Sequence, residues 1–300
     1  MLKLICFGFL GFLTLINAQE KVAETLYDSW QQSFASEEVL YEEKDGLQEL
    51  KIFRNPLFGK VLVIDGVIQT TEADEFIYHE MMAHVPLFSH LHPKKVLIVG
   101  GGDGGLAREV LRHPRIERVL LVDIDPSVVA FSKEHLPHLS QGAFDDPRLQ
   151  VVVADASEFV KNCKERFDVI LCDSTDPFGP GRVLFTQEFY SFCNNLLNEE
   201  GVFVNQAGVP FLQPEELSYI YEGLRGSFED VRFFLAPIPT YVGGFMAFGY
   251  ASNSFKKELP SLDFLQKRFE DWEGMLRYYN PQVHQASFAL PGYIKMLLAR

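Results

Sequence analysis

The sequence predicts an α/β protein in which a Rossmann-like sheet of mainly parallel strands follows a small N-terminal antiparallel β-domain. A β-branched run at residues 96–105, VLIVGGGDGG, ends in a glycine cluster and continues as a helix-like segment. A second apolar run, about twenty residues later, ends in acidic side chains, and both features are typical of nucleotide-binding sheets. Residues 39–75 alternate apolar and polar side chains between turn-forming pairs, which indicates short antiparallel strands.

Composition limits the classes of function. The chain has 300 residues, of which 47% are hydrophobic and 23% charged, as in an ordinary globular enzyme. With 41 acidic against 27 basic residues the net charge is −14. This charge argues against nucleic acid as a partner and agrees with a cationic small substrate. Solubility alone also explains an acidic composition. The four cysteines show no CxxC pair and no spacing with histidine that suits a metal, so we expect no metal site.

The chain divides into two domains. Turn-forming pairs at Asp45-Gly46, Asn55-Pro56 and Asp65-Gly66 place the β-domain at about residues 19–72, with a loop over residues 25–36 that carries Trp30. The Rossmann-like domain takes residues 73–300. It opens with helical spacing over residues 76–87, where Tyr78 and His79 are adjacent; a histidine in such a helix is more often a core or polar-face residue than a ligand.

Asp103 is the unusual residue of the glycine cluster. Phosphate-binding loops offer backbone N–H groups to anions, and a carboxylate at this position repels a phosphate or carboxylate ligand. The turn therefore predicts a ligand that is cationic at this point. A tight strand-to-helix turn without any ligand is the alternative.

Acidic side chains also end the next two strands. The strand over residues 118–125 ends in Asp123, which can accept hydrogen bonds from both hydroxyls of a ribose, and in Asp125, whose other role is to cap the following helix. The strand at 149–153 is followed by Asp155 and Ala156, placed to meet an adenine amino group. On spacing alone, capping of the next helix accounts for Asp155 equally well.

Two carboxylates follow the fourth strand, FDVILC. Asp173 and Asp176 precede a loop rich in proline and glycine, for which we expect no regular structure. This arrangement suits catalysis under a mobile lid. Turn formation alone would also favour aspartate and proline here. A fifth strand at 201–208, a helix at 214–226 and two final strands around Gly243-Gly244 complete the sheet. The final antiparallel pair is typical of methyltransferase-type sheets.

Four segments together resemble a known family: GGGDGG at 100–105, TEADEFIYHEMM at 71–82, DSTDPFGPGRVLFTQEFY at 173–190 and IPTYVGG at 238–244. They are similar to the polyamine aminopropyltransferases, the family of the spermidine synthases. The similarity runs from about Trp30 to the RYYNP and FALP segments near the C-terminus, and the segments occur in the family's order.

The resemblance implies roles for individual residues. Decarboxylated S-adenosylmethionine would be bound by Gln48, Asp103, Asp123, Asp155, Ala156 and Pro180, with Asp103 at the aminopropyl ammonium. Putrescine would lie along Trp30, Tyr78, His79, Asp103, Asp173, Asp176 and Tyr241. The family often has glutamate in place of Asp123 and glycine in place of Ala156, so we expect altered donor affinity and the same ligand.

The implied reaction is aminopropyl transfer to putrescine, giving spermidine and S-methyl-5′-thioadenosine. Asp173 would accept the proton of the attacking amine, and the reaction needs no metal or cofactor because the sulfonium donor is a co-substrate. One rival is an N-methyltransferase on the same sheet, which Asp103 disfavours because a methyl donor brings a carboxylate to this turn. The other is a catalytically silent homologue that binds polyamine or nucleoside, which the Asp173/Asp176 pair disfavours.

Assembly and location are also expectations. Exposed edges of the β-domain predict a homodimer or homotetramer. Residues 1–18, MLKLICFGFLGFLTLINA, resemble a secretory leader with Ala18 at the cleavage position, and they are too short for a confident spanning helix. Because the implied substrates are cytosolic, we expect a cytoplasmic enzyme, with export as the alternative if this leader acts.

Overall fold

The computed structural model describes residues 20–299, apart from residues 28, 45, 178 and 254–258 and the side chains of residues 179 and 180. The leader-like residues 1–18 therefore lie outside the described residues. No helix of the described part of the chain has the length and apolar character needed to cross a membrane.

A seven-stranded sheet forms the centre of the larger domain and confirms the predicted fold class. Its strand order is β12-β13-β11-β10-β7-β8-β9. The five strands from β11 to β9 are parallel, and β13 runs antiparallel to both β11 and β12. The strands are β7 (Lys95–Gly100), β8 (Arg118–Asp123), β9 (Leu149–Val153), β10 (Phe167–Asp173), β11 (Leu197–Gln206), β12 (Asp230–Ala236) and β13 (Met246–Ser252).

The strand order reverses between β7 and β10. From β7 the chain adds β8 and β9 on one side, and then crosses to add β10 and β11 on the other. Open α/β sheets bind ligands outside the carboxyl ends of the strands at such a reversal. The topology therefore places the site at Gly100, Asp123 and Asp173, where β7, β8 and β10 end.

Both faces of the sheet are covered because side chains of a strand alternate between faces. Val96 and Ile98 of β7 belong to one core, and Leu97 and Val99 belong to the other. The first core packs against α1 (Glu75–Ser89), α2 (Gly105–Leu111), α8 (Leu262–Phe269) and α9 (Pro281–Ser287). The second packs against α5 (Ala156–Asn162), α6 (Gln187–Asn195), α7 (Pro214–Arg225) and α10 (Gly292–Leu298).

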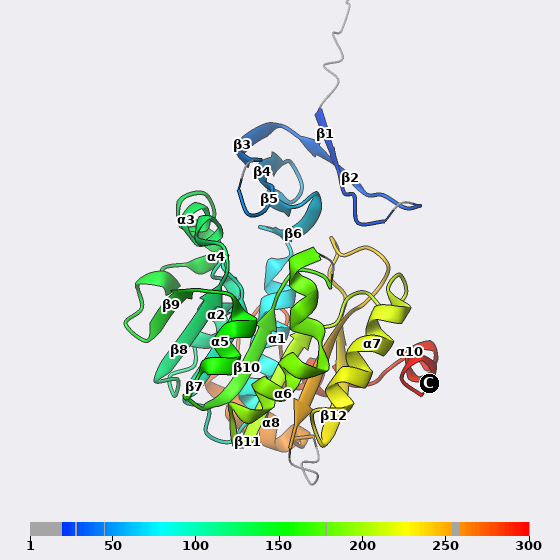
Figure 1. The fold of residues 1–300 in the computed structure, drawn as a ribbon. Coiled ribbons are helices and arrows are strands. Elements are labelled where there is room, and N and C mark those ends of the chain that lie inside the picture. Colours follow the sequence, from blue (N-terminus) through cyan, green and yellow to red (C-terminus); the bar gives the residue numbers. More distant parts are fainter. Residues whose placement is uncertain (1–19, 28, 45, 178, 254–258, 300) are drawn as a thin grey trace, which may run out of the picture.

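The N-terminal domain lies over the carboxyl-end edge of the central sheet (Figure 1). Its four-stranded antiparallel sheet comprises β3 (Glu38–Glu43), β4 (Leu50–Asn55), β5 (Gly59–Ile64) and β6 (Val67–Thr71). Asp65 and Gly66 both have positive φ, 50° and 78°, as a two-residue hairpin turn requires. Leu50, Ile52, Leu62 and Ile64 pack on α3 (Pro126–His135) and α4 (Pro137–Ser140), which joins the two domains.

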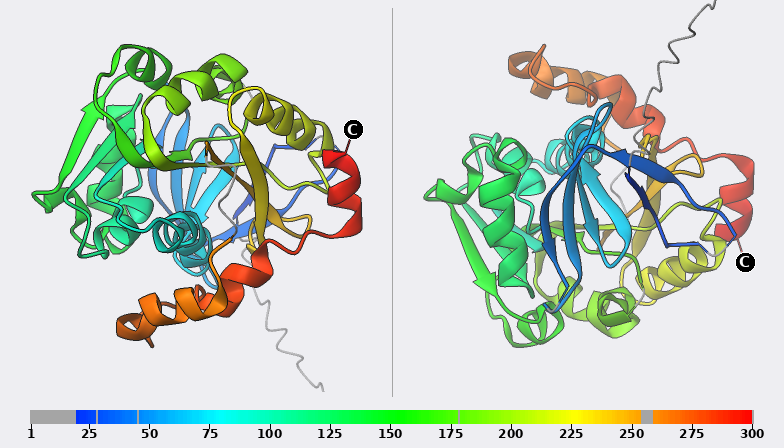
Figure 2. Two further views of the ribbon diagram at one scale, coloured as in Figure 1. Left: turned by 90° about the horizontal axis from the view of Figure 1, so that it is seen from below. Right: turned by 90° about the horizontal axis from the view of Figure 1, so that it is seen from above.

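The C-terminal segment runs along the outside of the larger domain, from α8 to α10 (Figure 2). It is held against α1 by a buried carboxylate: Glu80 accepts the backbone N–H groups of Arg277, Tyr278 and Tyr279 at 2.8–2.9 Å. Three short 3-10 helices complete the described elements: η1 (Ala143–Asp145), η2 (Gly179–Phe185) and η3 (Glu270–Trp272).

Two local expectations were wrong, and one helix is longer than predicted. Part of the predicted loop at 25–36 is β2 (Ser33–Ser36), which pairs with β1 (Glu20–Ala23); four residues are too few for an alternating pattern to be recognised. The first helix, predicted over residues 76–87, spans Glu75–Ser89 and includes Pro86, because tertiary packing of its buried residues outweighs the proline. The loop after Asp176 contains η2 where irregular structure was expected, since proline is tolerated in a first helical turn.

Candidate active site

A cavity of about 340 Å³ lies between the β-domain and the carboxyl ends of β7, β8 and β10. Most of the predicted site residues line it: Gln48, Tyr78, His79, Asp103, Asp123, Asp155, Ala156, Asp173, Asp176 and Tyr241. Pro180 belongs to η2, but its side chain lies outside the description. The structure thus brings together residues that are far apart in the sequence and come from both domains.

Packing within the protein requires glycine in this cluster, because a Cβ would clash with neighbouring atoms at two of its positions. Gly100 has a φ of 78°, and a Cβ added there would lie 2.1 Å from the backbone oxygen of Asp173. A Cβ on Gly102 would lie 2.6 Å from Oδ2 of Asp123. These two glycines therefore let β10 and the acid of β8 approach the turn, which brings Asp123 and Asp173 to one place.

Asp103 points into the cavity from the turn between β7 and α2. Its Oδ1 accepts the backbone N–H of Gly105 at 2.8 Å, and its Oδ2 lies 3.6 Å from Nε2 of His79. The other ring nitrogen of His79 lies 2.6 Å from Oε2 of Glu75. Burial alone would lower the pKa of His79, but Asp103 and Glu75 raise it to about 9, so the ring is a cation at neutral pH.

Asp173 ends β10 beside two tyrosines. The hydroxyl of Tyr78 donates to Oδ1 of Asp173 at 2.7 Å, and the Tyr78 and Tyr241 rings meet edge to face with centroids 6.0 Å apart. The hydroxyl of Tyr241 donates to the backbone oxygen of Gln69 in the β-domain. Burial and the nearby Asp103 raise the pKa of Asp173 to about 6, so this carboxyl can accept and release protons near neutral pH.

Acids of β8 and of the turn after β9 occupy another part of the cavity wall. Asp123 is 9% exposed; its Oδ1 accepts the N–H of Asp125, and burial raises its pKa. Asp155 caps α5 through the N–H groups of Ser157 and Glu158, which confirms the capping role. It also lines the cavity, and its contact with adenine stays a prediction. Asp125 caps α3 in the same way and is absent from the lining residues described.

The β-domain segment before β2 presents different residues from those expected. Trp30 is 44% exposed and is not among the described lining residues, whereas Glu24 and Tyr27 line the cavity. A backbone hydrogen bond from the N–H of Glu24 to the carbonyl oxygen of Gln32 closes the segment between β1 and β2 that carries Tyr27 and Trp30. The described cavity wall therefore includes Tyr27 from this segment, and contact of Trp30 with putrescine stays a prediction.

Glu24 and Asp74 are lining residues that the sequence did not single out. Glu24 is 6% exposed and accepts the side chain of Gln32 at 3.0 Å, and burial raises its pKa. Asp74 accepts both the backbone N–H and the hydroxyl of Thr240, which ties the segment after β12 to the start of α1. No periodicity marks these acids, because both lie at turns, so only the fold could reveal them.

Negative charge dominates the lining. It includes Glu24, Asp65, Asp74, Glu75, Asp103, Asp123, Asp155, Asp173 and Asp176, and among its described residues it contains neither lysine nor arginine. Low-dielectric walls lined by one sign of charge concentrate ligands of the opposite sign. The cavity is therefore built for a cationic small molecule with aromatic contacts at Tyr78 and Tyr241.

Two family models match consecutive parts of the chain. The model described as "Spermidine synthase tetramerisation domain" matches residues 21–72, and the model "Spermine/spermidine synthase domain" matches residues 75–261. The chain belongs to the spermine/spermidine synthase family.

Curated relatives and solved structures agree with this assignment. The chain is 52% identical to the polyamine aminopropyltransferase of Ruegeria sp. (strain TM1040), covering 91% of this chain and 96% of the relative, and 50% identical to that of Sodalis glossinidius, covering 93% and 97%. A spermidine synthase in complex with the transition-state analogue AdoDATO is 40% identical, with a TM-score of 0.88 over 93% of this chain and 95% of that one. Spermidine synthase from Thermotoga maritima has a TM-score of 0.85 at 39% identity, covering 93% and 94%.

Proposed function

We propose that this protein is a spermidine synthase, which transfers the aminopropyl group of decarboxylated S-adenosylmethionine to putrescine. The products are spermidine and S-methyl-5′-thioadenosine. The observation that carries the proposal is the acidic cavity at the strand reversal, where Asp103 stands in the glycine turn. A donor that keeps its carboxylate is repelled there, whereas a donor without it presents only its ammonium.

The donor occupies the side of the cavity formed by β7, β8 and the turn after β9. Asp123, which lines the cavity and also accepts the backbone N–H groups of Asp125 and Gly102, accepts hydrogen bonds from the ribose hydroxyls. Asp155 and Ala156 contact the adenine, and Gln48 and Pro180 close over the donor from the β-domain and from η2. Asp103 binds the aminopropyl ammonium. The donor is a co-substrate, and the reaction uses neither a further cofactor nor a metal.

Putrescine occupies the side formed by Tyr78, Tyr241 and the acids Asp173 and Asp176. Tyrosine faces stabilise alkylammonium groups by cation–π contact. His79 faces Asp103 on this side. At the far end Glu24, whose pKa Asp176 also raises, is available to the second ammonium of the diamine.

The chemical step is a displacement at carbon. The free amine of putrescine forms a bond to the propyl carbon next to sulfur, the carbon–sulfur bond breaks, and sulfur leaves as a neutral thioether. The attacking nitrogen loses a proton, which Asp173 accepts and then releases to solvent. Because the leaving group gains no negative charge, orientation of the two cations accounts for most of the catalysis.

A product assay tests this function. The purified protein is incubated with S-adenosylmethionine or its decarboxylated form, together with putrescine, cadaverine, agmatine or spermidine, and the products are identified by mass. We expect addition of an aminopropyl group to putrescine from the decarboxylated donor only. Addition of a methyl group would identify an N-methyltransferase, and absence of any product would leave a binding protein.

Assembly and location are part of the proposal. The match of residues 21–72 to a tetramerisation domain supports a homo-oligomer built through the β-domain, and light scattering distinguishes a dimer from a tetramer. We place the enzyme in the cytoplasm with its substrates. Cell fractionation tests this location, since recovery outside the cytoplasm of a chain that lacks residues 1–18 would contradict it.

A further inference from the structure

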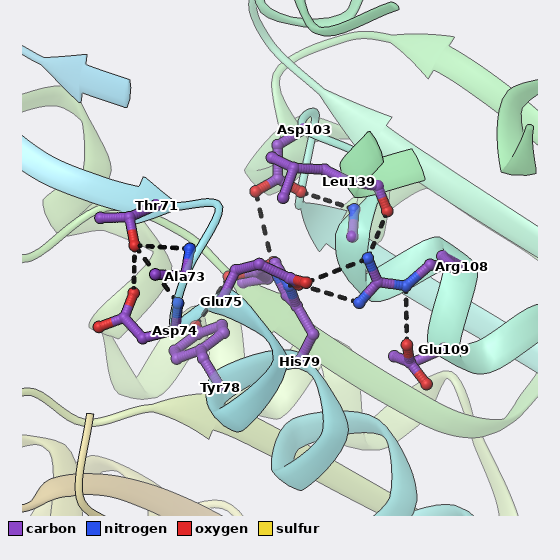
Figure 3. A network of polar contacts seen from close by, with 12 residues as sticks. Thr71, Ala73, Asp74, Glu75, Tyr78, His79, Asp103, Arg108, Glu109 and Leu139 are labelled. Atoms are coloured by element: carbon purple, nitrogen blue, oxygen red, sulfur yellow. Dashed lines mark hydrogen bonds and ion pairs between the residues drawn. The ribbon is translucent and has the colours of Figure 1, made fainter. Parts of the chain in front are cut away.

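A chain of buried charged groups leads away from the cavity, and the reaction as described uses only its first members. The chain runs from Asp103 through His79 and Glu75 to Arg108 and Glu109 (Figure 3). Glu75 is 7% exposed, Arg108 is 6% exposed and Glu109 is 1% exposed. Buried charges cost free energy unless they are paired, so each of these groups depends on its neighbours.

Arg108 fixes the carboxylate of Glu75. Its two terminal nitrogens bind Glu75 as a fork, with Nη2 2.9 Å from Oε2 and Nη1 3.3 Å from Oε1. The guanidinium is itself held by Glu109, 2.7 Å from Nε, and by the backbone oxygen of Leu139, 2.6 Å from Nη1. A bidentate arginine holds a carboxylate in one plane, so Glu75 presents Oε2 to His79 in a fixed direction.

The ring of His79 is fixed on three sides. Glu75, one helical turn before it on α1, accepts from Nδ1 at 2.6 Å, and Asp103 faces Nε2. A Cβ on Gly105 would lie 2.3 Å from Cε1 of the ring, so the imidazole packs directly on that backbone. A ring with a carboxylate at each nitrogen is in position to be an imidazolium ion.

This cation acts on the residue proposed as the base. The charged groups that face His79 are Glu75 on its own helix, Asp103 in the glycine turn and Asp173 on β10. His79 in turn lowers the pKa of Asp173, against burial and Asp103, which raise it. Glu75 contacts His79, and His79 acts on Asp173, so Glu75 can influence Asp173 through His79.

We propose that Glu75, held by Arg108, is a positioning residue for amine transfer, which fixes His79 as a cation beside Asp103 in the cavity that Asp173 also lines. The inference rests on the proposed function, because Asp173 matters to the rate only as the acceptor of the amine's proton. Without the Glu75 charge, His79 loses its proton more easily, and Asp173 then holds its proton to higher pH.

The test is the pH profile of kcat/KM for putrescine in Glu75→Gln, with Glu109→Gln as the matched control. Both substitutions remove a buried carboxylate bound to Arg108, but only Glu75 also contacts His79. We expect the midpoint of the acidic limb to rise in Glu75→Gln by at least about half a pH unit, a threefold change in proton affinity. We expect Glu109→Gln to keep the wild-type midpoint. His79→Gln should move the midpoint in the same direction, and adding Glu75→Gln to it should change nothing more.

Two results would overturn the proposal: an unchanged acidic limb in folded Glu75→Gln, or an equal rise in Glu109→Gln. If Glu75→Gln does not fold, His79→Gln replaces it, because it removes the cation that Glu75 holds; an unchanged midpoint there would also refute the idea. The wild-type enzyme is assayed in parallel. Lack of aminopropyl transfer by the wild type refutes the proposed function, whereas a normal wild type with an unshifted variant refutes only the role of Glu75.

Discussion

Asp173→Asn should lower activity and raise stability together, and this pairing follows from the environment of one carboxyl group. Burial, with Asp103, raises the pKa of Asp173 from 3.8 to about 6. The proposed base must be charged, and a pKa raised by about 2 disfavours the charged form in the folded protein. The free-energy cost at neutral pH is at most about 3 kcal/mol. An asparagine has the same shape and no charge, and it can still accept the hydroxyl of Tyr78.

The sign of the pH dependence follows from linkage. Because the folded pKa lies above the unfolded value, the native state binds more protons between about pH 4 and pH 6, and the wild type loses stability relative to the variant as pH rises through that window. We expect the unfolding midpoint of Asp173→Asn to exceed that of the wild type by a few degrees at pH 7 and to match it below pH 4. Turnover should fall by about a hundred- to ten-thousandfold, the usual contribution of a general base.

Two assays measure these effects: calorimetric unfolding at several pH values, and single-turnover transfer followed by mass. Near-normal turnover in Asp173→Asn would remove this residue from the role of base. If the variant is less stable than the wild type at pH 7, then neighbouring groups stabilise the buried charge of Asp173 and do not destabilise it.

Three further substitutions test other parts of the site. Asp103→Asn should weaken binding of the decarboxylated donor about 10- to 100-fold, the equivalent of one charged hydrogen bond. It should barely affect binding of S-methyl-5′-thioadenosine, which has no ammonium. Equal losses of affinity for both, measured by calorimetry, would contradict the ammonium contact. Glu24→Gln should raise KM for putrescine several-fold and leave donor affinity unchanged. A change in donor affinity alone would contradict the contact of Glu24 with putrescine. Glu80→Ala should cost about 3 kcal/mol or more of unfolding free energy, because it leaves three backbone N–H groups without their acceptor. If denaturant unfolding gives this variant a free energy of unfolding within about 1 kcal/mol of the wild type, then water replaces the carboxylate as acceptor.

Strand ends and acids could be predicted from the sequence because they depend on local pattern and on one topological rule. The apolar runs ending at Gly100, Asp123 and Asp173 are each complete in a few residues, and parallel strands bring their carboxyl ends to one edge. The same logic located Asp103 in the cavity. It could not show that Gly100 is needed mainly to let Asp173 approach, since that contact joins residues 73 positions apart.

What the sequence did not reveal depends on packing between distant segments. Trp30 drew attention as a large aromatic on a loop, but in the structure it is 44% exposed, and Tyr27 from the same segment lines the cavity. The charge on His79 depends partly on a local pair, with Glu75 four residues before it, and partly on Asp103 on another element, which only the fold brings close. Residue identity predicted which side chains have the right chemistry, and only the fold shows which of them line the cavity.

The central claim is that a carboxylate in the glycine turn selects a donor that has lost its own carboxylate. Isothermal calorimetry of the wild-type protein with S-adenosylmethionine and with its decarboxylated form measures that selection directly. We predict that the decarboxylated form binds at least about tenfold more tightly, which corresponds to about 1.4 kcal/mol. Equal affinities, or tighter binding of S-adenosylmethionine itself, would contradict the account.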